Sequence, residues 1–322
     1  MTGVPDRSAD PLVTVVITTY NRPSFLRSAV ETVVAQDYEP IELVVVDDCS
    51  ETPAREVLED HTPEVTSFES RRHAENRGAN AARNTGVDAA SGEFIAFLDD
   101  DDRWEPEKIS RQVEAFRRAG DDVGLVYTGR KVVDDGSVDE VRLPEIPDGD
   151  ITKALLCRNV VGTQSSVMVR TDVARETPFD ETMPRWADLE WYVAVSTECE
   201  FAAVREPLVI YTRGALNRIS DDYGVLEESY RIFVDKYRDL AATYGQRFER
   251  KMLAWSAFRV GNASLNAGNY DMARRYFLTA LVRYPFEPEF YIYAATALGG
   301  RRTHWVSRKL KRLLPPRLLP VS

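Results

Sequence analysis

The sequence predicts an α/β protein with a mainly parallel sheet flanked by helices, followed by an all-helical C-terminal extension. Two observations lead there. In the first half, short apolar runs rich in β-branched residues alternate with segments whose apolar residues recur at helical spacing. After residue 221, helical spacing continues almost to the end without further strand-like runs. Alternation of the first kind is typical of parallel sheets, whose strands are joined by right-handed crossovers.

The expected elements follow the chain in order. Strands are expected at 12–18, 41–46, 65–69, 94–98, 123–127 and 164–170. Helices are expected at 23–34, 53–60, 79–90, 106–119 and 186–197. Pro23 suits the first turn of its helix, because a proline there sacrifices no hydrogen bond. A hairpin turn is expected at 134–137, and the regular alternation stops near residue 145.

Composition excludes several classes of protein. The 322 residues carry 41 basic and 52 acidic side chains, a net charge of −11, which argues against nucleic-acid binding. No apolar run approaches the roughly 18 residues of a membrane span, and the first residues lack the apolar segment of a signal peptide. A cytoplasmic protein is therefore expected. The three cysteines lie far apart and predict neither a disulfide framework nor a zinc site.

Four consecutive aspartates, 99–102, follow the apolar run 94–98. Adjacent carboxylates repel one another and raise each other's pKa, so a cation is expected among them. Mg²⁺ or Mn²⁺ shared with substrate phosphates fits, because such ions prefer oxygen ligands. In extended chain Asp99 and Asp101 point the same way while Asp100 points elsewhere. The alternative is a solvated turn that caps the next helix, for which one aspartate would be enough.

Other polar groups follow the first two strands and open the third helix. They are Thr19, Tyr20 and Arg22, then Asp47 and Asp48, then Arg77 and Arg83. In open α/β sheets, ligands bind at the edge where the carboxyl ends of the strands gather. There a carboxylate can accept the N3–H of uracil, a tyrosine can stack on a base, and arginines can bind phosphate oxygens. Each residue also has an ordinary alternative as a helix cap or a surface position.

The sequence lacks the usual glycine-rich phosphate-binding loops. No GxGxxG follows the first strand, and no GxxxxGK[ST] occurs. Side chains and a metal ion would therefore have to hold a bound nucleotide.

Five motifs taken together resemble a known family. TYNRP, VVDDCS, NRGANAARN, FLDDDDRW and WADLEWY occur in the order found in family 2 glycosyltransferases and cover about residues 12–215. None of them is specific alone, but the series is. The resemblance implies the GT-A fold and an inverting transfer of sugar from a nucleotide-diphosphate donor. It also implies a catalytic domain over 1–220, with a nucleotide-sugar half at about 12–145 and an acceptor half at 146–220.

The resemblance also assigns roles to single positions. It implies nucleotide-sugar contacts for Thr19, Tyr20, Arg22, Asp47, Asp48, Arg77, Arg83, Asp99 and Asp100. Asp47 would be directed at uracil, and a divalent cation, Mn²⁺ or Mg²⁺, would be bound by Asp101 and Asp99. Asp188 matches the proposed catalytic base. Ala187 stands where the family usually has glutamate, so Glu190 is kept as a second candidate for the base.

The expected reaction moves a hexose or hexuronic acid, preferably from a UDP-sugar, to a hydroxyl of a glycan acceptor. Relatives in the family suggest a lipid-linked, dolichol phosphate-type oligosaccharide in cell-surface or N-glycan assembly. A helical region at 221–300, whose 257–285 part resembles one tetratricopeptide repeat, precedes a basic tail at 301–322. If this tail forms a helix, Trp305 and several leucines lie on one face and the basic residues on the other. Such a helix favours peripheral association with the cytoplasmic face of the cell membrane. Packing of the tail on the helical region is the alternative.

Two other classes of function stay open. A sugar-phosphate nucleotidyltransferase can share such a sheet and its metal-binding aspartates, but the missing glycine-rich loop argues against it. A non-catalytic sugar-nucleotide or protein-binding module is supported by Ala187 and by the helical region. The intact Asp99, Asp101 and Asp188 argue against that module.

Overall fold

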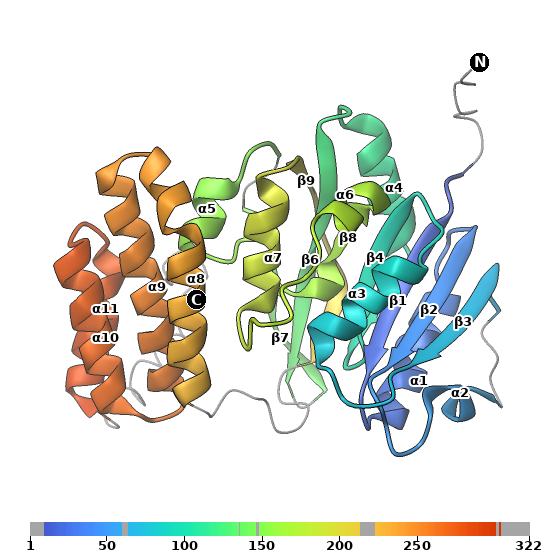
Figure 1. The fold of residues 1–322 in the computed structure, drawn as a ribbon, viewed down its shortest axis with the longest axis horizontal. Coiled ribbons are helices and arrows are strands. Elements are labelled where there is room, and N and C mark those ends of the chain that lie inside the picture. The colour runs from blue at the N-terminus through green and yellow to red at the C-terminus, as the bar shows by residue number, and fades with distance from the viewer. Residues whose placement is uncertain are drawn as a thin grey trace. The chain divides into compact units, whose positions relative to one another are not determined.

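The computed structural model describes residues 10–59, 64–134, 136–145, 148–212, 223–300 and 303, which belong to two compact units (Figure 1). The first unit is drawn from Met1–Leu155, Asn159–Thr182 and Ala187–Leu216. The second is drawn from Leu156–Arg158, Met183–Trp186 and Asn217–Ser322. Two short segments, 156–158 and 183–186, thus belong to the second unit although the chain on both sides of each belongs to the first, which the sequence does not indicate.

A mixed sheet organises the first unit. Its strands are β1 (Val13–Thr19), β2 (Ile41–Asp47), β3 (Ser67–Arg72), β4 (Phe94–Asp99), β5 (Asp102–Trp104), β6 (Val123–Asp134), β7 (Ser137–Arg142), β8 (Val167–Arg170) and β9 (Glu200–Thr212). They lie in the order β3-β2-β1-β4-β8-β6-β9-β5, and β7 pairs with β6. The strands β3, β2, β1 and β4 are parallel neighbours, whereas β8 pairs antiparallel with β4 and β6. The predicted parallel half is confirmed, and the later strands extend it as a mixed sheet.

The parallel register brings the polar strand ends to one edge. Thr19 lies opposite Asp47, and Thr18 lies opposite Asp99. Asp47 in turn lies opposite Arg72 at the end of β3. The alignment follows from burial, because nearly every residue before these ends packs into the core. One edge therefore carries the carboxyl ends of β1, β2 and β4, as the sequence predicts.

Helices follow the strands of this unit (Figure 1). They are α1 (Pro23–Val34), α2 (Ala54–Val57), α3 (Ala79–Ala89), α4 (Lys108–Arg118), α5 (Thr152–Cys157), which ends in a segment of the second unit, α6 (Thr171–Glu176) and α7 (Ala187–Ser196). The packing of α3 on β1 is close: a Cβ at Gly86 would come within 2.3 Å of Val16 Cγ1. Only glycine allows this approach, which sets the position of the helix that carries Arg83.

Several boundaries differ from the predicted ones. The segment 164–170 begins as a 3-10 turn, η2 (Gln164–Ser166), and becomes a strand only at β8. The helix predicted at 53–60 consists of the four residues of α2. The sequence does not reveal β5 or β9. In β9 the reason is Pro207, which pairs with Gly129 at a shift in register, since proline within a run weakens a strand prediction.

The second unit is helical in its described residues. Its helices are α8 (Tyr223–Thr243), α9 (Gln246–Asn266), α10 (Tyr270–Arg283) and α11 (Pro288–Leu298), which confirms the predicted helical extension. Aromatic rings fill its core, where the ring centroid of Phe258 lies 5.0–5.3 Å from those of Phe277, Phe290 and Tyr293. A Cβ at Gly261 would come within 2.8 Å of Phe277, so this glycine lets α9 and α10 pack closely as a hairpin.

The sequence predicts membrane contact only for the basic tail at the end of the chain. No helix in the described ranges is both long and apolar enough to cross a membrane. Apart from Thr303, the predicted basic tail lies outside the described residues. Its amphipathic helix therefore stays a prediction from sequence.

Candidate active site

The four consecutive aspartates lie on a turn. β4 ends at Asp99, residues 100 and 101 turn, and β5 begins at Asp102. The chain is therefore not extended at this point, although the exposure of the four side chains still alternates. The side chains of Asp99 and Asp101 are 27% and 23% exposed, whereas those of Asp100 and Asp102 are buried. Solvent thus reaches the first and third carboxylates.

Asp100 ties this turn to the end of β1. Thr19 Oγ1 donates a hydrogen bond to Asp100 Oδ2 at 2.7 Å, and Arg22 Nη1 lies 3.0 Å from Asp100 Oδ1. The same Arg22 nitrogen lies 3.2 Å from Asp101 Oδ2. Burial raises the pKa of Asp100 to about 6, although the hydrogen bond from Thr19 and the charge of Arg22 oppose the rise. These four residues form one connected group.

Asp102 fixes the geometry of the turn. Ser165 Oγ donates to Asp102 Oδ2 at 2.6 Å and accepts from the Asp99 N–H at 3.1 Å. Trp104 Nε1 donates to the Ser165 carbonyl at 2.9 Å. Burial, followed by the charge of Asp99, raises the pKa of Asp102 well above its ordinary value. The turn is thereby attached to η2.

A single guanidinium joins the end of β4 to the predicted base. Arg83 is buried on α3, with Nη2 2.7 Å from Asp99 Oδ1 and Nη1 3.8 Å from Asp188 Oδ1. Asn80 Oδ1 accepts from Arg83 Nη1 at 3.4 Å. The ring centroid of Phe179 lies 5.6 Å from Cζ of the same guanidinium. These contacts hold Arg83 between two carboxylates that are far apart in sequence.

Asp188 has the properties of a general base. It lies in the first turn of α7, and its side chain is 33% exposed, so a substrate hydroxyl can reach it. The surrounding protein still desolvates the carboxyl group, which raises the pKa of Asp188 to about 6. The charge of Arg83 opposes this rise, and the charge of Asp99 adds to it. A carboxylate with this pKa is ionised at neutral pH and still accepts a proton readily. Glu190, the second candidate, is buried.

The first carboxylate after β2 is surrounded by backbone donors. Asp47 Oδ1 accepts from the Ser50 N–H at 2.8 Å, and Asp47 Oδ2 accepts from the Ala54 N–H at 3.0 Å. Arg72 Nη1 lies 3.4 Å from Asp47 Oδ2. Asp47 thereby organises the turn that leads into α2.

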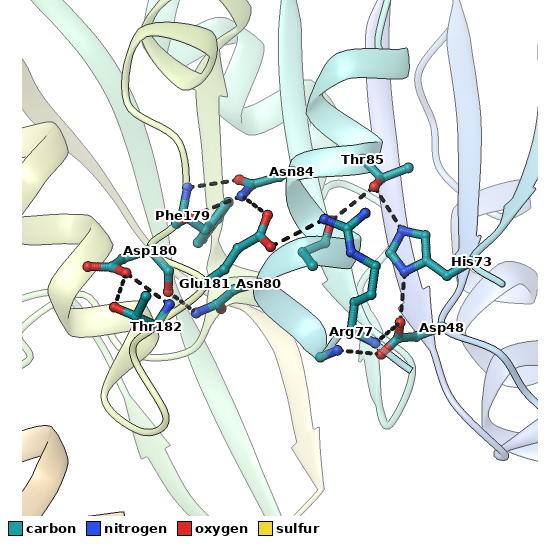
Figure 2. A network of polar contacts seen from close by, with 12 residues as sticks. Asp48, His73, Arg77, Asn80, Asn84, Thr85, Phe179, Asp180, Glu181 and Thr182 are labelled. Carbon is teal, nitrogen blue, oxygen red and sulfur yellow. Dashed lines mark hydrogen bonds and ion pairs between the residues drawn. The ribbon is translucent and has the colours of Figure 1, made fainter. Parts of the chain in front are cut away.

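The second carboxylate, Asp48, organises the loop before α3 (Figure 2). It accepts from the N–H groups of Arg77 and Gly78 at 2.8 and 2.7 Å. His73 Nδ1 lies 2.7 Å from Asp48 Oδ1, and His73 Nε2 lies 2.9 Å from Thr85 Oγ1. Gly78 has a φ of 90°, a conformation that glycine adopts without strain. Asp48 therefore sets the entry into α3.

The segment 179–182 contacts α3 and its preceding loop (Figure 2). Asn84 Nδ2 donates to the Phe179 carbonyl at 3.0 Å and to Glu181 Oε1 at 3.1 Å. Arg77 Nη2 lies 3.3 Å from Glu181 Oε2, and these two side chains are 46% and 43% exposed. An exposed ion pair contributes little stability, so a phosphate can replace Glu181 as the partner of Arg77 at small cost.

Sequence reasoning misses two residues of this network. His73 and Glu181 lie outside the recognised motifs, and no spacing pattern marks a lone histidine after a strand. Of the predicted residues, Tyr20 follows β1 with 46% of its surface exposed, open to stacking, and it belongs to neither the Arg22 group nor the Arg83 bridge.

Asp99 and Asp101 fit a divalent cation shared with a diphosphate. Both are partly exposed; Asp101 pairs with the partly exposed Arg22, which can turn to a phosphate, and Asp99 pairs with the buried Arg83. Within the described residues, no group of three or more His, Cys, Asp or Glu side chains could hold a metal ion. A cation that takes one or two carboxylates and completes its shell with phosphate oxygens and water is the usual arrangement for Mg²⁺. The donor set suits Mg²⁺ or Mn²⁺ bound together with substrate.

The fold and the series of strand-end motifs define a glycosyltransferase. The chain belongs to glycosyltransferase family 2, since the model described as "Glycosyl transferase family 2" matches residues 14–176. One relative is the "Putative teichuronic acid biosynthesis glycosyltransferase TuaG" of Bacillus subtilis (strain 168), 35% identical over 108 residues. That match covers 32% of this chain and 41% of the relative, so the chain spans less than half of the relative's length.

Two solved structures share the fold. TarS 1-349 of S. aureus superposes with a TM-score of 0.60 at 17% identity, covering 93% of this chain and 91% of that one. The mannosyltransferase PcManGT of Pyrobaculum calidifontis gives a TM-score of 0.51 at 17% identity, covering 96% and 89%. The predicted family and GT-A type of fold are confirmed.

Proposed function

We propose that the chain is an inverting, metal-dependent hexosyltransferase that moves a sugar from a nucleotide-diphosphate donor, preferably a UDP-sugar, to a hydroxyl of a glycan acceptor. One observation carries the proposal: Arg83 bridges Asp99 and Asp188 at 2.7 and 3.8 Å. The bridge brings a proposed metal-binding carboxylate and a proposed base into one site. Structures of the same fold support a nucleotide-sugar donor, since TarS is described with UDP and UDP-GlcNAc and PcManGT with GDP-Man and Mn²⁺.

On the donor side, the exposed groups at the sheet edge would bind the nucleotide. Mn²⁺ or Mg²⁺ held by Asp101 and Asp99 would supply Lewis-acid stabilisation of the leaving diphosphate. Arg22 and Arg77, both partly exposed, would donate hydrogen bonds to phosphate oxygens. Tyr20 would stack on the base.

Three buried aspartates have proposed roles close to the nucleotide. Asp47 would accept the N3–H of uracil, because a carboxylate has about four acceptor sites and three donors contact it here. Asp48 would position the loop that carries Arg77, because it accepts the Arg77 N–H. Asp100 would keep Thr19 and Arg22 in place.

On the acceptor side, Asp188 would remove the proton from the attacking hydroxyl. The oxygen would form its bond to the anomeric carbon as the bond to the diphosphate breaks on the opposite face. One displacement of this kind inverts the anomeric configuration. Arg83 would keep the carboxylate oriented and ionised, since its charge lowers the pKa of Asp188.

The acceptor that we propose is a glycan of the cell surface, lipid-linked and met at the cytoplasmic face of the membrane. The similarity to TuaG, a putative teichuronic acid biosynthesis glycosyltransferase, supports a surface polysaccharide. The tail at 301–322 would contact the membrane, and the catalytic residues would all belong to 1–220, with the helical region at 221–300 contributing none. Both assignments rest on sequence.

Calorimetric titration with UDP, GDP, dTDP and CDP, each with and without Mn²⁺, tests the donor site. We expect one nucleotide to bind in a metal-dependent manner, and we expect this binding to be lost in Asp101→Ala. Asp121→Ala, an exposed aspartate in the turn before β6, is the matched control. Binding that ignores both metal and Asp101 would favour a non-catalytic module. Release of diphosphate from a nucleoside triphosphate and a sugar phosphate would instead identify a nucleotidyltransferase.

A further inference from the structure

A positive side chain that forms no ion pair with any described residue lies near the proposed base. Arg130, on β6, is largely buried but not closed off from solvent. Its side chain makes no hydrogen bond or ion pair with any residue in the described part of the chain. Glu140, whose charge acts on it, lies 2.9 Å from Arg142 instead. Burial, and then the charge of Arg142, lowers the pKa of Arg130. Among the described residues, this largely buried guanidinium therefore has no anion paired with it.

The chain makes room for Arg130 beside the segment that contacts Asp188. A Cβ at Gly162 would come within 1.8 Å of Arg130 Nη1, and Gly162 has a φ of 111°. Asn159 holds this turn by accepting the Gly162 N–H at 2.7 Å. Two residues further on, the Gln164 N–H is hydrogen-bonded to Asp188. Arg130 and the proposed base therefore flank the same short segment, 162–164.

Polar groups without partners lie in the same place. The hydroxyl of Tyr192, one helical turn after Asp188, is fully buried and has no hydrogen-bond partner among the residues that the structure describes. The charges of Asp188, Arg83 and Arg130 all act on this hydroxyl. The side-chain amide of Gln164 is likewise buried without a partner. Buried polar atoms without partners are rare in folded proteins, and together these groups indicate a site that a polar ligand completes.

We propose that Arg130, with Tyr192 beside it, binds an acidic substituent on the glycan acceptor, a carboxylate or a phosphate, and so selects acidic acceptors. The proposal rests on the proposed function, because it needs the acceptor hydroxyl at Asp188. A guanidinium offers a planar fork of donors that matches both acids. With its acidic group on Arg130, an acceptor is oriented with a neighbouring hydroxyl toward Asp188.

Calorimetry with three simple probes tests this site: methyl β-D-glucuronide, glucose 6-phosphate and the neutral methyl β-D-glucoside, each with and without UDP and Mn²⁺. We expect one acidic probe to bind at least tenfold more tightly than the neutral one. The stronger of the two distinguishes a uronic acid from a sugar phosphate as the source of the acid. Arg130→Gln should weaken that probe at least tenfold, whereas Arg130→Lys should retain part of its affinity.

Two further variants keep the test decisive. Lys131→Gln removes one positive charge from the neighbouring residue, which pairs with Glu105 at 2.6 Å, and should leave the acidic probe unaffected. Tyr192→Phe removes only an unpartnered hydroxyl, so the fold should persist while the acidic probe binds several-fold more weakly. If Arg130→Gln does not fold, Tyr192→Phe and Arg130→Lys still report on the site.

Equal affinity for acidic and neutral probes, no binding of either acid, or unchanged affinity in the Arg130 and Tyr192 variants would overturn the proposal. Selective loss of UDP-glucuronate binding over UDP-glucose binding in Arg130→Gln would also overturn it, because the acid would then belong to the donor. The UDP titration separates the two proposals: intact UDP binding without acid preference rejects only the acceptor site, and absent UDP binding rejects the donor model.

Discussion

The aspartates after β2 and those after β4 look alike in sequence but have different partners. Asp47 and Asp48 are buried, and each accepts two backbone N–H groups within 3.0 Å. Asp99 and Asp101 are partly exposed and are held by the side chains of arginines. Backbone donors cannot move without refolding the chain, whereas an arginine side chain can rotate to a new anion. The first pair therefore builds the edge, and the second pair remains available to a metal ion and a substrate.

The largest effect is expected at Asp188, the proposed base, which pairs with the same arginine, Arg83, as Asp99 does. Asp188→Asn should lower kcat by about 10²- to 10⁴-fold, the usual contribution of a general base, because an amide accepts no proton. Nucleotide binding and the thermal midpoint should change little. Initial rates and a UDP titration measure both effects, with Asp121→Asn as the control. Normal turnover in Asp188→Asn would reject the base assignment and leave Glu190 as the candidate.

Replacing Asp101 should separate function from stability. Asp101→Ala should lower the rate by about 10²- to 10³-fold, the range for removing one group that stabilises developing charge. The thermal midpoint should stay near that of the wild type, since Asp101 and its ion-pair partner Arg22 are both partly exposed, and such pairs contribute little stability. Initial rates across a Mn²⁺ titration, together with thermal melts, provide the measurement.

Replacing Asp48 should show the reverse pattern. Asp48→Ala leaves the N–H groups of Arg77 and Gly78 and the ring of His73 without their acceptor. We expect the free energy of unfolding to fall by about 3 kcal/mol, since each orphaned buried donor is costly. Urea denaturation measures the loss. A variant as stable as wild type but devoid of nucleotide binding would place Asp48 among the ligand-exchanging carboxylates instead.

The pH dependence of the rate should report the environment of Asp188. Its pKa is raised to about 6, so the carboxyl group is protonated below that pH and cannot act as a base. We expect kcat/KM to fall about tenfold per pH unit below 6 and to level off above it. Rates between pH 4.5 and 8 measure the profile. The same break in the residual activity of Asp188→Asn would assign it to another group.

The smallest effect is expected at Thr85, at the far end of the Asp48 network. Thr85→Val removes the contact with His73 Nε2 at 2.9 Å and should cost about 1 kcal/mol of stability. Urea denaturation and the UDP titration should show this small loss with unchanged binding. A large loss of nucleotide affinity would mean that the network positions the ligand directly.

Sequence patterns predict the parallel half of the sheet well and the later strands poorly. The runs at 12–18, 41–46 and 94–98 are buried on both faces, so their composition alone marks them as strands. β9 carries Pro207, and its buried residues lie near both of its ends with exposed residues between them, so they follow no two-residue period. No local pattern reveals such a strand.

By itself, the sequence determined the family, the parallel edge and the set of charged residues gathered on it. Local spacing is enough there, since strand ends of a parallel sheet must meet at one edge. Only the tertiary structure decided which carboxylates accept backbone N–H groups and which are partly exposed and pair with arginines. It alone also placed Arg130 beside the segment that contacts Asp188. Partners and burial depend on contacts between distant segments, and these contacts set the pKa and the availability of each group.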